Sequence, residues 1–339
     1  MAVTLKDISK EAGVDVATVS RALNGSYGVH KATREKVMAV AKRLNYRANL
    51  LARELAVGRS RTLGLLVPDI GNPYVTEVVR GAEDAAYAAG YHILLCNSYL
   101  DATREVQYMR SLLDKRVEGI LMHSVQNLSE AEVKELSGSG IPVVLLSRSP
   151  SASTFSGVCV NLYEAGVIAG EHLIELGHKK VALLNGPRDH ANFTEQAKGF
   201  VKAVTAGDQG VTPIVLNGPP SLDGGYQMAK KLLEQNPGVT AIFAANDVTA
   251  FGVARAIFEA GLSIPEDISL IGSNNVELAD VVRPPLTTIH IPKYEMGQAA
   301  VEILLDLARS GRLRVPQQRE FGVRLVKRCS TSPPAKKTK

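Results

Sequence analysis

The chain has 339 residues, of which 45% are hydrophobic and 22% are charged; this size and balance predict a globular protein of two or three domains and argue against a fibrous or disordered chain. No apolar run approaches the roughly 18 residues that span a bilayer, and the N-terminal residues lack the apolar core of a signal peptide, so we expect neither a membrane protein nor an exported one. The three cysteines, Cys96, Cys159 and Cys329, lie far apart, which favours a reducing compartment over a disulfide framework or a metal site.

The positive charge is concentrated near the N-terminus. Residues 1–61 contain 12 Lys and Arg against 5 Asp and Glu, a net charge of +7, whereas the other 278 residues contain 27 against 29, a net charge of −2. A small basic head on a nearly neutral body is typical of a protein whose partner is a polyanion.

The first 46 residues predict three short helices. Residues 5–12 follow a helical period, Gly13 permits a sharp turn, and Asp15 is a suitable N-cap for a second helix over about 16–24. A third helix is expected over about 32–44. Two short helices joined by a glycine turn and supported by a third helix form a helix-turn-helix unit.

Residues 47–61 form a linker with helical potential that is too short to fold alone. From residue 62 onward, apolar strands such as 62–69 and 240–247 alternate with amphipathic helices such as 162–176 and 222–235. This alternation predicts an α/β fold with parallel sheets that are covered on both faces.

The chain contains two successive runs of alternating strands and helices, of similar length, so we expect two similar lobes. The expected boundaries are about 62–160 and 292–322 for the N-terminal lobe, about 161–291 and 323–330 for the C-terminal lobe, and 331–339 for a disordered basic tail.

The sequence contains none of the common catalytic or cofactor motifs. A G-x-x-x-x-G-K-[ST] loop, a G-x-G-x-x-G turn, a G-x-S-x-G elbow and an H-E-x-x-H motif are all missing. We therefore expect no enzymatic activity, no cofactor and no metal site.

Amides and hydroxyls recur where the predicted strands end, as in residues 185–187, 217–220, 244–247 and 272–275. Ligands bind at the carboxyl ends of parallel strands, so these side chains are candidates for a binding cleft. The alternative is that they only cap the helices that follow. That alternative is less convincing for the whole set, because both lobes would direct these side chains into one cleft.

Over essentially its whole length the chain resembles the lactose/galactose repressor (LacI/GalR) family. The resemblance rests on TLKDISKEAGVDVATVSRALNG near the N-terminus, a highly specific helix-turn-helix signature, and on HLIELGHKKVALLNGP, AIFAANDVTAFGV and PPLTTIHIPKYEMG in the body. It implies a DNA-binding head, a hinge helix over the linker and a core like that of a periplasmic binding protein. It also implies a cytoplasmic, nucleoid-associated transcriptional repressor that binds a palindromic double-stranded DNA operator as a homodimer and is gated by a small effector.

The resemblance places the polar face of the second helix in the major groove of DNA, where small side chains allow close approach and an arginine can reach a guanine or a phosphate. Val16, Ala17 and Arg21 are then the main base readers, and Leu55 matches a leucine that the family wedges into a central minor-groove step. Ala48 stands where the family usually has proline, which makes the start of the hinge helix less rigid. The full expected DNA-binding set is Thr4, Val16, Ala17, Thr18, Ser20, Arg21, Asn24, Thr33, Asn49 and Leu55.

The expected effector-binding set is Asn72, Tyr74, Ser147, Arg148, Asn161, Gln196, Asn246, Asp247, Asn274 and Asn275. The chain departs from the family here, because Ser147, Asn274 and Asn275 stand where the family commonly has aspartate and Gln196 stands where it commonly has arginine. Neutral amides suit a neutral or zwitterionic polar molecule, such as a sugar or a nucleoside stacked on Tyr74, and suit an anionic sugar phosphate poorly.

Two other functions fit parts of the sequence. An effector-independent architectural DNA-binding protein would have the same head, and a solute-binding protein would have the same core. The basic head and the lack of a signal peptide argue against the solute-binding protein.

No leucine heptad follows Cys329, so we expect a dimer without a coiled-coil tetramer arm.

Overall fold

The computed structural model describes residues 3–25, 27–46, 60–123, 128–146, 154–188, 190–206, 211–310 and 315–335. The chain divides into two compact units, residues 1–60 and 61–339, and each is described by itself. Within the described residues, no helix is long and apolar enough to cross a membrane.

The described part of the N-terminal unit contains three helices, as the sequence predicts for residues 1–46: α1 (Leu5–Ala12), α2 (Val16–Leu23) and α3 (Lys31–Arg43). Their apolar sides meet in a small core around Ile8, Val19 and Val37, which are fully buried. Gly13 ends α1 in a left-handed conformation with φ of 63°, and this turn sends the chain into α2.

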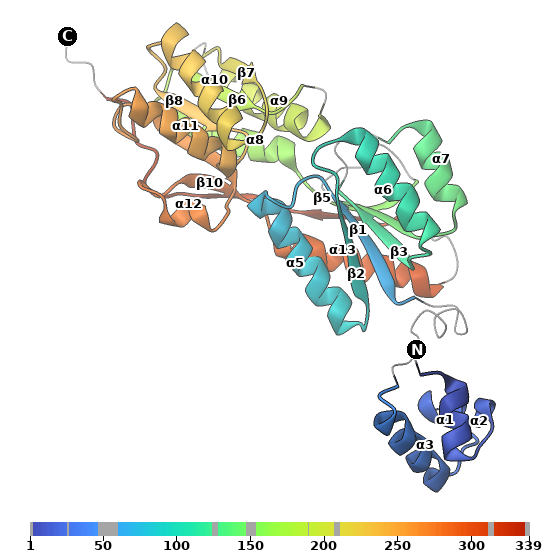
Figure 1. Cartoon of the computed structure of the whole chain (residues 1–339). Coiled ribbons are helices and arrows are strands. Elements are labelled where there is room, and N and C mark those ends of the chain that lie inside the picture. Colours follow the sequence, from blue (N-terminus) through green and yellow to red (C-terminus); the bar gives the residue numbers. More distant parts are fainter. Residues whose placement is uncertain are drawn as a thin grey trace. The chain divides into compact units, whose positions relative to one another are not determined.

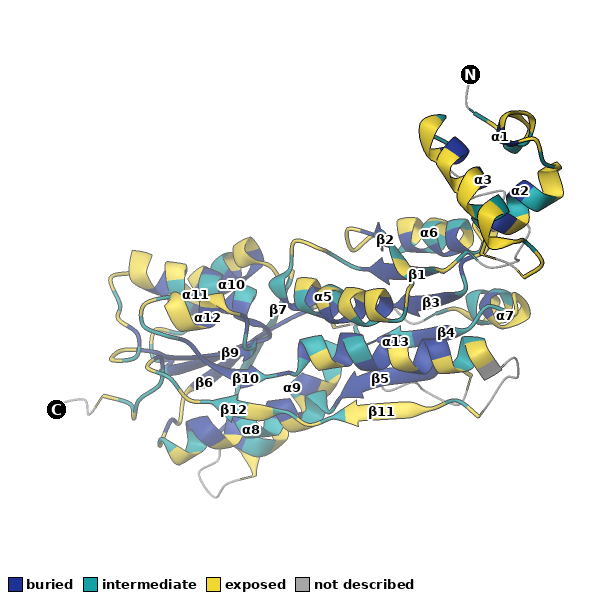
Figure 2. Cartoon of the chain, turned by 90° about the horizontal axis from the view of Figure 1, so that it is seen from below, coloured by how far each residue is buried: buried dark blue, intermediate teal, exposed yellow. Residues whose placement is uncertain are grey.

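The C-terminal unit contains two lobes, and the first, the N-lobe, is built on a six-stranded parallel sheet with the order β11-β5-β4-β3-β1-β2. Its strands are β1 (Thr62–Val67), β2 (His92–Asn97), β3 (Gly119–Met122), β4 (Val143–Leu146), β5 (Ser156–Val160) and β11 (Gln318–Phe321). Helices α5 (Pro73–Ala88) and α13 (Lys293–Ser310) cover one face, and α6 (Ala102–Asp114) and α7 (Glu130–Gly138) cover the other (Figure 1). Because both faces are covered, β1 and β3 are buried along almost their whole length (Figure 2).

The second lobe, the C-lobe, has a six-stranded sheet with the order β12-β10-β9-β8-β6-β7, in which only β12 runs antiparallel to its neighbour. Its strands are β6 (Val181–Asn185), β7 (Ile214–Asn217), β8 (Ala241–Ala244), β9 (Ser269–Asn274), β10 (Thr287–His290) and β12 (Arg324–Val326). Helices α8 (Leu162–Glu175) and α9 (Ala191–Thr205) cover one face, and α10 (Leu222–Gln235) and α11 (Asp247–Glu259) cover the other, beside the short α12 (Leu278–Val281). The predicted fold class, two parallel-sheet α/β lobes with an N-terminal helical head, is confirmed.

The chain passes between the two sheets after β5, after β10 and after β11, so three segments of chain join the lobes. The carboxyl ends of β1, β3 and β5 in one lobe and of β6, β8 and β9 in the other meet around one cavity between the lobes. This arrangement positions the candidate ligand site described below.

In both lobes, paired helices pack against each other with glycines at the points of closest approach. In the α8–α9 pair, a Cβ atom on Gly199 would lie 1.9 Å from the carbonyl oxygen of Tyr163, and one on Gly166 would lie 2.0 Å from the carbonyl oxygen of Gln196. Each helix therefore lies directly against the backbone of its partner, an approach that only glycine allows. The same relation holds between α5 and α13 and between α10 and α11.

The sequence predicts a disordered tail from residue 331. In the structure, the first residues of this tail are instead hydrogen-bonded to the C-lobe. The hydroxyl of Thr331 lies 3.0 Å from Nε2 of His172, and the carbonyl of Ser332 lies 2.9 Å from Nε2 of His178. The prediction is wrong for these residues because two buried histidines on α8 and the following turn supply partners that composition alone does not reveal.

We expect the buried His178 to make the C-lobe acid-sensitive. The carbonyl of Ser332 can only accept a hydrogen bond, so Nε2 of His178 carries the proton of a neutral ring, and burial lowers the pKa of His178 below its ordinary value although the hydrogen bond to Ser332 opposes the shift. A histidine that is neutral when folded takes up a proton on unfolding, so the free energy of unfolding should fall as the pH drops below about 6.5. Urea unfolding at pH 7.5 and pH 5.5 should show a smaller pH effect in His178→Gln than in the parent protein; an equal effect would contradict this prediction.

Candidate functional site

The polar face predicted for α2 is exposed in the structure. Val16, Ala17, Arg21 and Asn24 are exposed, while Val19 and Ala22 on the other side are buried in the head's core. Among the described residues, the Arg21 side chain hydrogen-bonds within its own helix, with Nε 3.4 Å from the carbonyl oxygen of Ala17. Its guanidinium is therefore available to a ligand outside the head.

Two threonines at the starts of α1 and α2 take part in helix capping: Thr4 is the N-cap of α1, and Thr18 is the third residue of α2, whose N-cap is Asp15. The Thr18 amide and hydroxyl donate to Asp15 at 2.8 and 2.7 Å, and these hydrogen bonds lower the pKa of the Asp15 carboxyl. The Thr4 hydroxyl similarly donates to Asp7 at 2.7 Å. Both threonines stand at helix N-termini, where backbone amides favour a phosphate oxygen.

The remaining predicted DNA-binding residues fall into two groups. Ser20 and Thr33 are half-buried on α2 and in the first turn of α3, and Ser20 Oγ lies 3.4 Å from Asn24 Nδ2. Asn49 and Leu55 lie outside the described residues, together with most of the predicted hinge segment.

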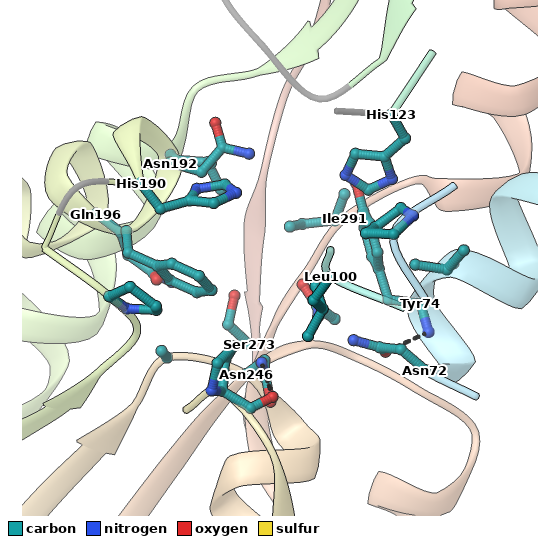
Figure 3. Close-up of a pocket in the computed structure, with 18 of the residues that line it drawn as sticks. Asn72, Tyr74, Leu100, His123, His190, Asn192, Gln196, Asn246, Ser273 and Ile291 are labelled. Carbon is teal, nitrogen blue, oxygen red and sulfur yellow. Dashed lines mark hydrogen bonds between the residues drawn. The ribbon is translucent and has the colours of Figure 1, made fainter. Parts of the chain in front are cut away.

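The second site is a cavity of about 410 Å³ between the two lobes (Figure 3). Of the predicted effector residues, five line it, and all five lie at or just after the carboxyl end of a strand or on the helix that follows. They are Asn72, Tyr74, Gln196, Asn246 and Asn274. Ser147 and Arg148 lie outside the described residues.

Three other predicted effector residues do not line the cavity and are corrected here. Asp247 is fully buried, where its carboxylate accepts from the Thr288 hydroxyl at 2.6 Å and the Val276 amide at 2.8 Å. Asn275 is held between Arg328 Nη2 at 2.8 Å and His290 Nδ1 at 3.2 Å. Asn161 caps α8 by accepting from the Glu164 amide at 3.0 Å.

The burial of Asp247 also changes the charge of the site. Loss of water around this carboxyl raises its pKa to about 7, although the hydrogen bonds from Thr288 and Val276 oppose the shift. The described residues that line the cavity include no aspartate, glutamate, lysine or arginine. The described lining is therefore polar but carries no formal negative charge.

Several residues that line the cavity are not in the expected effector-binding set. They are Leu100, His123, His190, Asn192, Phe193, Ser273 and Ile291, among others. Ser273 lies in the strand-end segment 272–275 that the sequence singles out, and His123 directly follows β3, whereas His190, Asn192 and Phe193 follow the segment 185–187 at the start of α9. If the first helical turn after each strand had also been counted among the candidate ligand-binding residues, these three would have been included.

Aromatic pairs stand on both sides of the cavity. Tyr74 and His123 of the N-lobe meet edge to face with ring centroids 5.8 Å apart, and His190 and Phe193 of the C-lobe lie 5.1 Å apart. Figure 3 shows Tyr74 and His123 facing His190 across the open space. Such rings offer flat apolar surface to a bound molecule.

Two family models together match almost the whole chain. The model described as "Bacterial regulatory proteins, lacI family" matches residues 4–49, and the model described as "Periplasmic binding proteins and sugar binding domain of LacI family" matches residues 60–328. The chain belongs to the LacI family. It is a DNA-binding transcriptional repressor of this family with an effector-binding core, and the family resemblance read from the sequence is confirmed.

Curated relatives and solved structures agree with this assignment. Catabolite control protein A of Priestia megaterium is 35% identical over 95% of this chain and 98% of its own length. The HTH-type transcriptional repressor PurR of Vibrio vulnificus is 38% identical over 89% of this chain and 91% of its own.

Among solved structures, the lac repressor dimer bound to operator and the anti-inducer ONPF matches with a TM-score of 0.86 and 28% identity over 98% of this chain and all of that one. A LacI-family regulator from Enterococcus faecium with bound ribose matches with a TM-score of 0.72 and 34% identity over 81% of this chain and all of that one.

In this LacI-family chain, a buried lysine fixes one wall of the cavity. Lys293 begins α13 of the N-lobe, and its Nζ donates to the carbonyl oxygens of Asn274, Asn275 and Ile291 at 2.5, 3.1 and 3.3 Å. Asn274 has a φ of 104°, an uncommon backbone conformation for a residue with a side chain. Lys293 therefore ties the N-lobe to the strained turn of the C-lobe that presents Asn274 to the cavity.

Proposed function

We propose that this LacI-family repressor binds a palindromic operator as a homodimer and that a neutral polar molecule in the cavity between the lobes changes its affinity for that operator. The observation that carries the proposal is the cavity lining, in which the buried Ser273 hydroxyl has no hydrogen-bond partner among the described residues and no described residue is an aspartate, glutamate, lysine or arginine. Because the proposed target is chromosomal DNA, we place the protein in the cytoplasm at the nucleoid.

The head supports the DNA-binding part of the proposal. Its exposed α2 face combines a small residue, Ala17, with Arg21, whose guanidinium has no acidic partner among the described residues in hydrogen-bond contact. The lac repressor dimer that this chain resembles is bound to an operator. A dimer with one head per chain reads two half-sites about one helical turn apart, which predicts a palindrome.

An apolar surface on the C-lobe supports the dimer. Phe258 of α11 and Leu278 and Val281 of α12 expose 46%, 50% and 59% of their surface. Phe258 also lines a groove of about 430 Å³ whose lining is mostly apolar, with Ala254 and Leu286 among its members and the charged Arg255, Glu259 and Arg283 beside them. Apolar side chains gathered beside a groove are typical of a protein–protein interface, and a second copy of this chain is the occupant that a palindromic operator requires.

Replacing Phe258 with glutamate should therefore break the dimer, because it places a charge in the middle of this surface. We expect sedimentation velocity to show a monomer and operator affinity to fall, since each monomer would contact only one half-site. Tyr99→Glu, a change at an exposed aromatic residue of the N-lobe, should leave both properties unchanged. A dimer that persists in Phe258→Glu would place the interface elsewhere.

The effector part of the proposal rests on the neutral cavity. Amides donate and accept hydrogen bonds, so they suit sugars, polyols or nucleosides, whereas a sugar phosphate would find no cation among the described lining residues. Two similar structures are described with bound ribose and as a cellobiose complex, and both ligands are neutral sugars.

A thermal-shift screen of neutral sugars, polyols, nucleosides and sugar phosphates tests this part. A neutral ligand at a hundredfold excess over its Kd should stabilise the core by about 2.7 kcal/mol, and Gln196→Ala should reduce that shift. A melting temperature that rises only with sugar phosphates would refute the neutral site. The positive compound is then added to an operator-binding titration by fluorescence anisotropy, where an unchanged affinity would favour the effector-independent DNA-binding protein.

A further inference from the structure

A second hollow lies on the C-lobe alone, between α9 and β7, the edge strand of its sheet. This α9–β7 groove has a volume of about 600 Å³. Residues 194, 197, 198, 201 and 202 of α9 line the groove, whereas residues 192, 193 and 196 of the same helix line the cavity between the lobes. At 100° per residue these two sets lie on opposite sides of α9, so the groove is a separate site.

The rim of the α9–β7 groove is positively charged. Its described lining contains three basic residues, Arg188, Lys198 and Lys202, and no acidic one. Glu195 lies outside the lining and pairs with Lys198 at 2.7 Å. Lys202 Nζ lies 5.7 Å from the centroid of the Tyr163 ring, a contact that does not neutralise its charge. Three positive charges and one negative charge leave the rim with a net charge of +2.

The exposed Arg188 side chain is oriented by its neighbours. In the amide orientation that satisfies both of its polar groups, Asn217 accepts from Arg188 Nε at 3.1 Å and donates to the Gly186 carbonyl oxygen at 3.1 Å. The carbonyl oxygen of Arg188 also accepts from the Thr194 hydroxyl at 3.0 Å. Nη1 and Nη2 of Arg188 hydrogen-bond to no other described residue. A guanidinium held at Nε in this way presents a pair of donors that matches two oxygens of one phosphate.

The floor of the groove is hydrocarbon. Ala197 and Val201 of α9 and Val215 of β7 line it. The other polar members of the lining are engaged or buried: the Thr194 hydroxyl donates to the carbonyl described above, and Asn185 exposes only 3% of its surface, with its unpartnered Oδ1 also buried. A ligand in the groove therefore meets cations at the rim and apolar surface between them.

We propose that the α9–β7 groove binds a small phosphomonoester, with its phosphate at Arg188 and Lys198 and an apolar group against the floor. A phosphate monoester carries a charge of about −1.5 to −2 at pH 7, which balances the charge of the rim. Hydrogen bonds between charged partners are the strong ones, and burial of the apolar group is favourable in proportion to the area removed from water. This inference goes beyond the proposed function, because it concerns another surface and another class of ligand.

A phosphomonoester fits this groove better than a carboxylate does. A carboxylate carries one negative charge and two oxygens, so it leaves part of the rim unbalanced once its oxygens bind the guanidinium of Arg188. The third oxygen and second charge of a phosphate can also reach Lys198, which lies one helical turn beyond Thr194 on the same side of α9. The ion pair of Lys198 with Glu195 is exposed, so exchanging it for a phosphate costs little.

Three matched probes test the inference on the full-length protein by isothermal titration calorimetry at pH 7.5: phenyl phosphate, methyl phosphate and benzoate. We expect phenyl phosphate to bind at least about fivefold more tightly than methyl phosphate, because only the phenyl group covers the floor. We also expect it to bind at least about fivefold more tightly than benzoate, because only the phosphate balances the rim.

Four variants locate the binding site. Arg188→Gln changes an exposed side chain, so it should fold, and it should weaken phenyl phosphate at least about tenfold. Asn217→Ala keeps every charge but removes the acceptor at Nε of Arg188, so it should weaken phenyl phosphate about threefold or more. Lys230→Gln, an exposed residue of α10 outside the groove, and Gln196→Ala, in the cavity between the lobes, are controls and should change nothing.

Each contrary outcome overturns a defined part of the inference. No binding of phenyl phosphate up to about 10 mM, or an equal loss in Arg188→Gln and Lys230→Gln, overturns the site and leaves only attraction to a basic surface. Affinity for benzoate equal to that for phenyl phosphate overturns the phosphate class, and equal affinity for methyl phosphate overturns the role of the floor. A loss in Gln196→Ala without a loss in Arg188→Gln places the anion in the cavity, which overturns this inference and the neutral ligand proposed above.

Discussion

Replacing Gly199 with alanine should destabilise the C-lobe by roughly 3 kcal/mol or more, because the added methyl group has no space. Its Cβ atom would lie 1.9 Å from the Tyr163 carbonyl oxygen and 3.1 Å from the Val167 amide nitrogen, and both obstacles are backbone atoms of α8. Overpacking against movable side chains already costs about 1–3 kcal/mol. Here two helices must separate along a buried crossing that includes Phe200 and Val204.

Calorimetry or a thermal melt monitored by circular dichroism measures the effect. For a unit about the size of the C-lobe, 1 kcal/mol corresponds to about 2–4 °C in Tm, so Gly199→Ala should lower the Tm of the C-lobe by roughly 6–12 °C. Gly138→Ala is the matched control, because Gly138 ends α7 and a Cβ atom added there would have no atom within 4 Å, so Tm should stay unchanged or rise slightly. An unchanged Tm in Gly199→Ala would show that α8 and α9 can separate freely.

The same substitution should also affect the ligand cavity. Helix α9 carries Asn192, Phe193 and Gln196, so moving α9 away from α8 displaces much of the C-lobe side of the cavity. Structural glycines and ligand-binding side chains are thus linked through one helix.

The strands and helices of the core could be predicted from the sequence because their signals are local. The helix predicted over 222–235 is observed over the same residues, and the one predicted over 162–176 ends one residue earlier. Fully buried strands are recognisable as apolar runs. The glycine crossings could not be predicted, because Gly166 and Gly199 are distant in sequence and nothing local shows that their helices meet.

The position of the candidate ligand site could be predicted from the sequence, but only some of the residues that line it could. Strand ends placed Asn72, Asn246 and Asn274 at the cavity, because parallel strands end at a common edge, whereas Gln196 on α9 was expected there only from the family resemblance. Sequence could not tell which member of an adjacent pair faces the ligand. Asn246 lines the cavity, whereas the next residue, Asp247, points into the core to hold Thr288 and Val276.

Replacing Arg21 with alanine should lower affinity for the cognate operator by about 1–3 kcal/mol, or roughly 5- to 150-fold, if its guanidinium forms a bidentate contact with a base. Arg21 extends from the exposed face of α2, and among the described residues its nearest hydrogen-bond acceptor is the carbonyl oxygen of Ala17 at 3.4 Å. No ion pair with another described residue has to be broken before Arg21 binds DNA. Fluorescence anisotropy with operator and random-sequence duplexes measures the change in each affinity.

A matched variant separates base reading from loss of charge. Arg43→Ala removes the same charge from the head, but Arg43 lies on α3 and is ion-paired with Glu11. If Arg21 reads a base, Arg21→Ala should weaken operator binding far more than random-DNA binding, while Arg43→Ala should affect both equally and weakly. If Arg21 contacts only phosphate, Arg21→Ala should weaken both duplexes alike and reduce the slope of log affinity against log salt by about 0.9. That second pattern would remove Arg21 from the base-reading set and leave sequence recognition to Val16, Ala17 and their neighbours on α2.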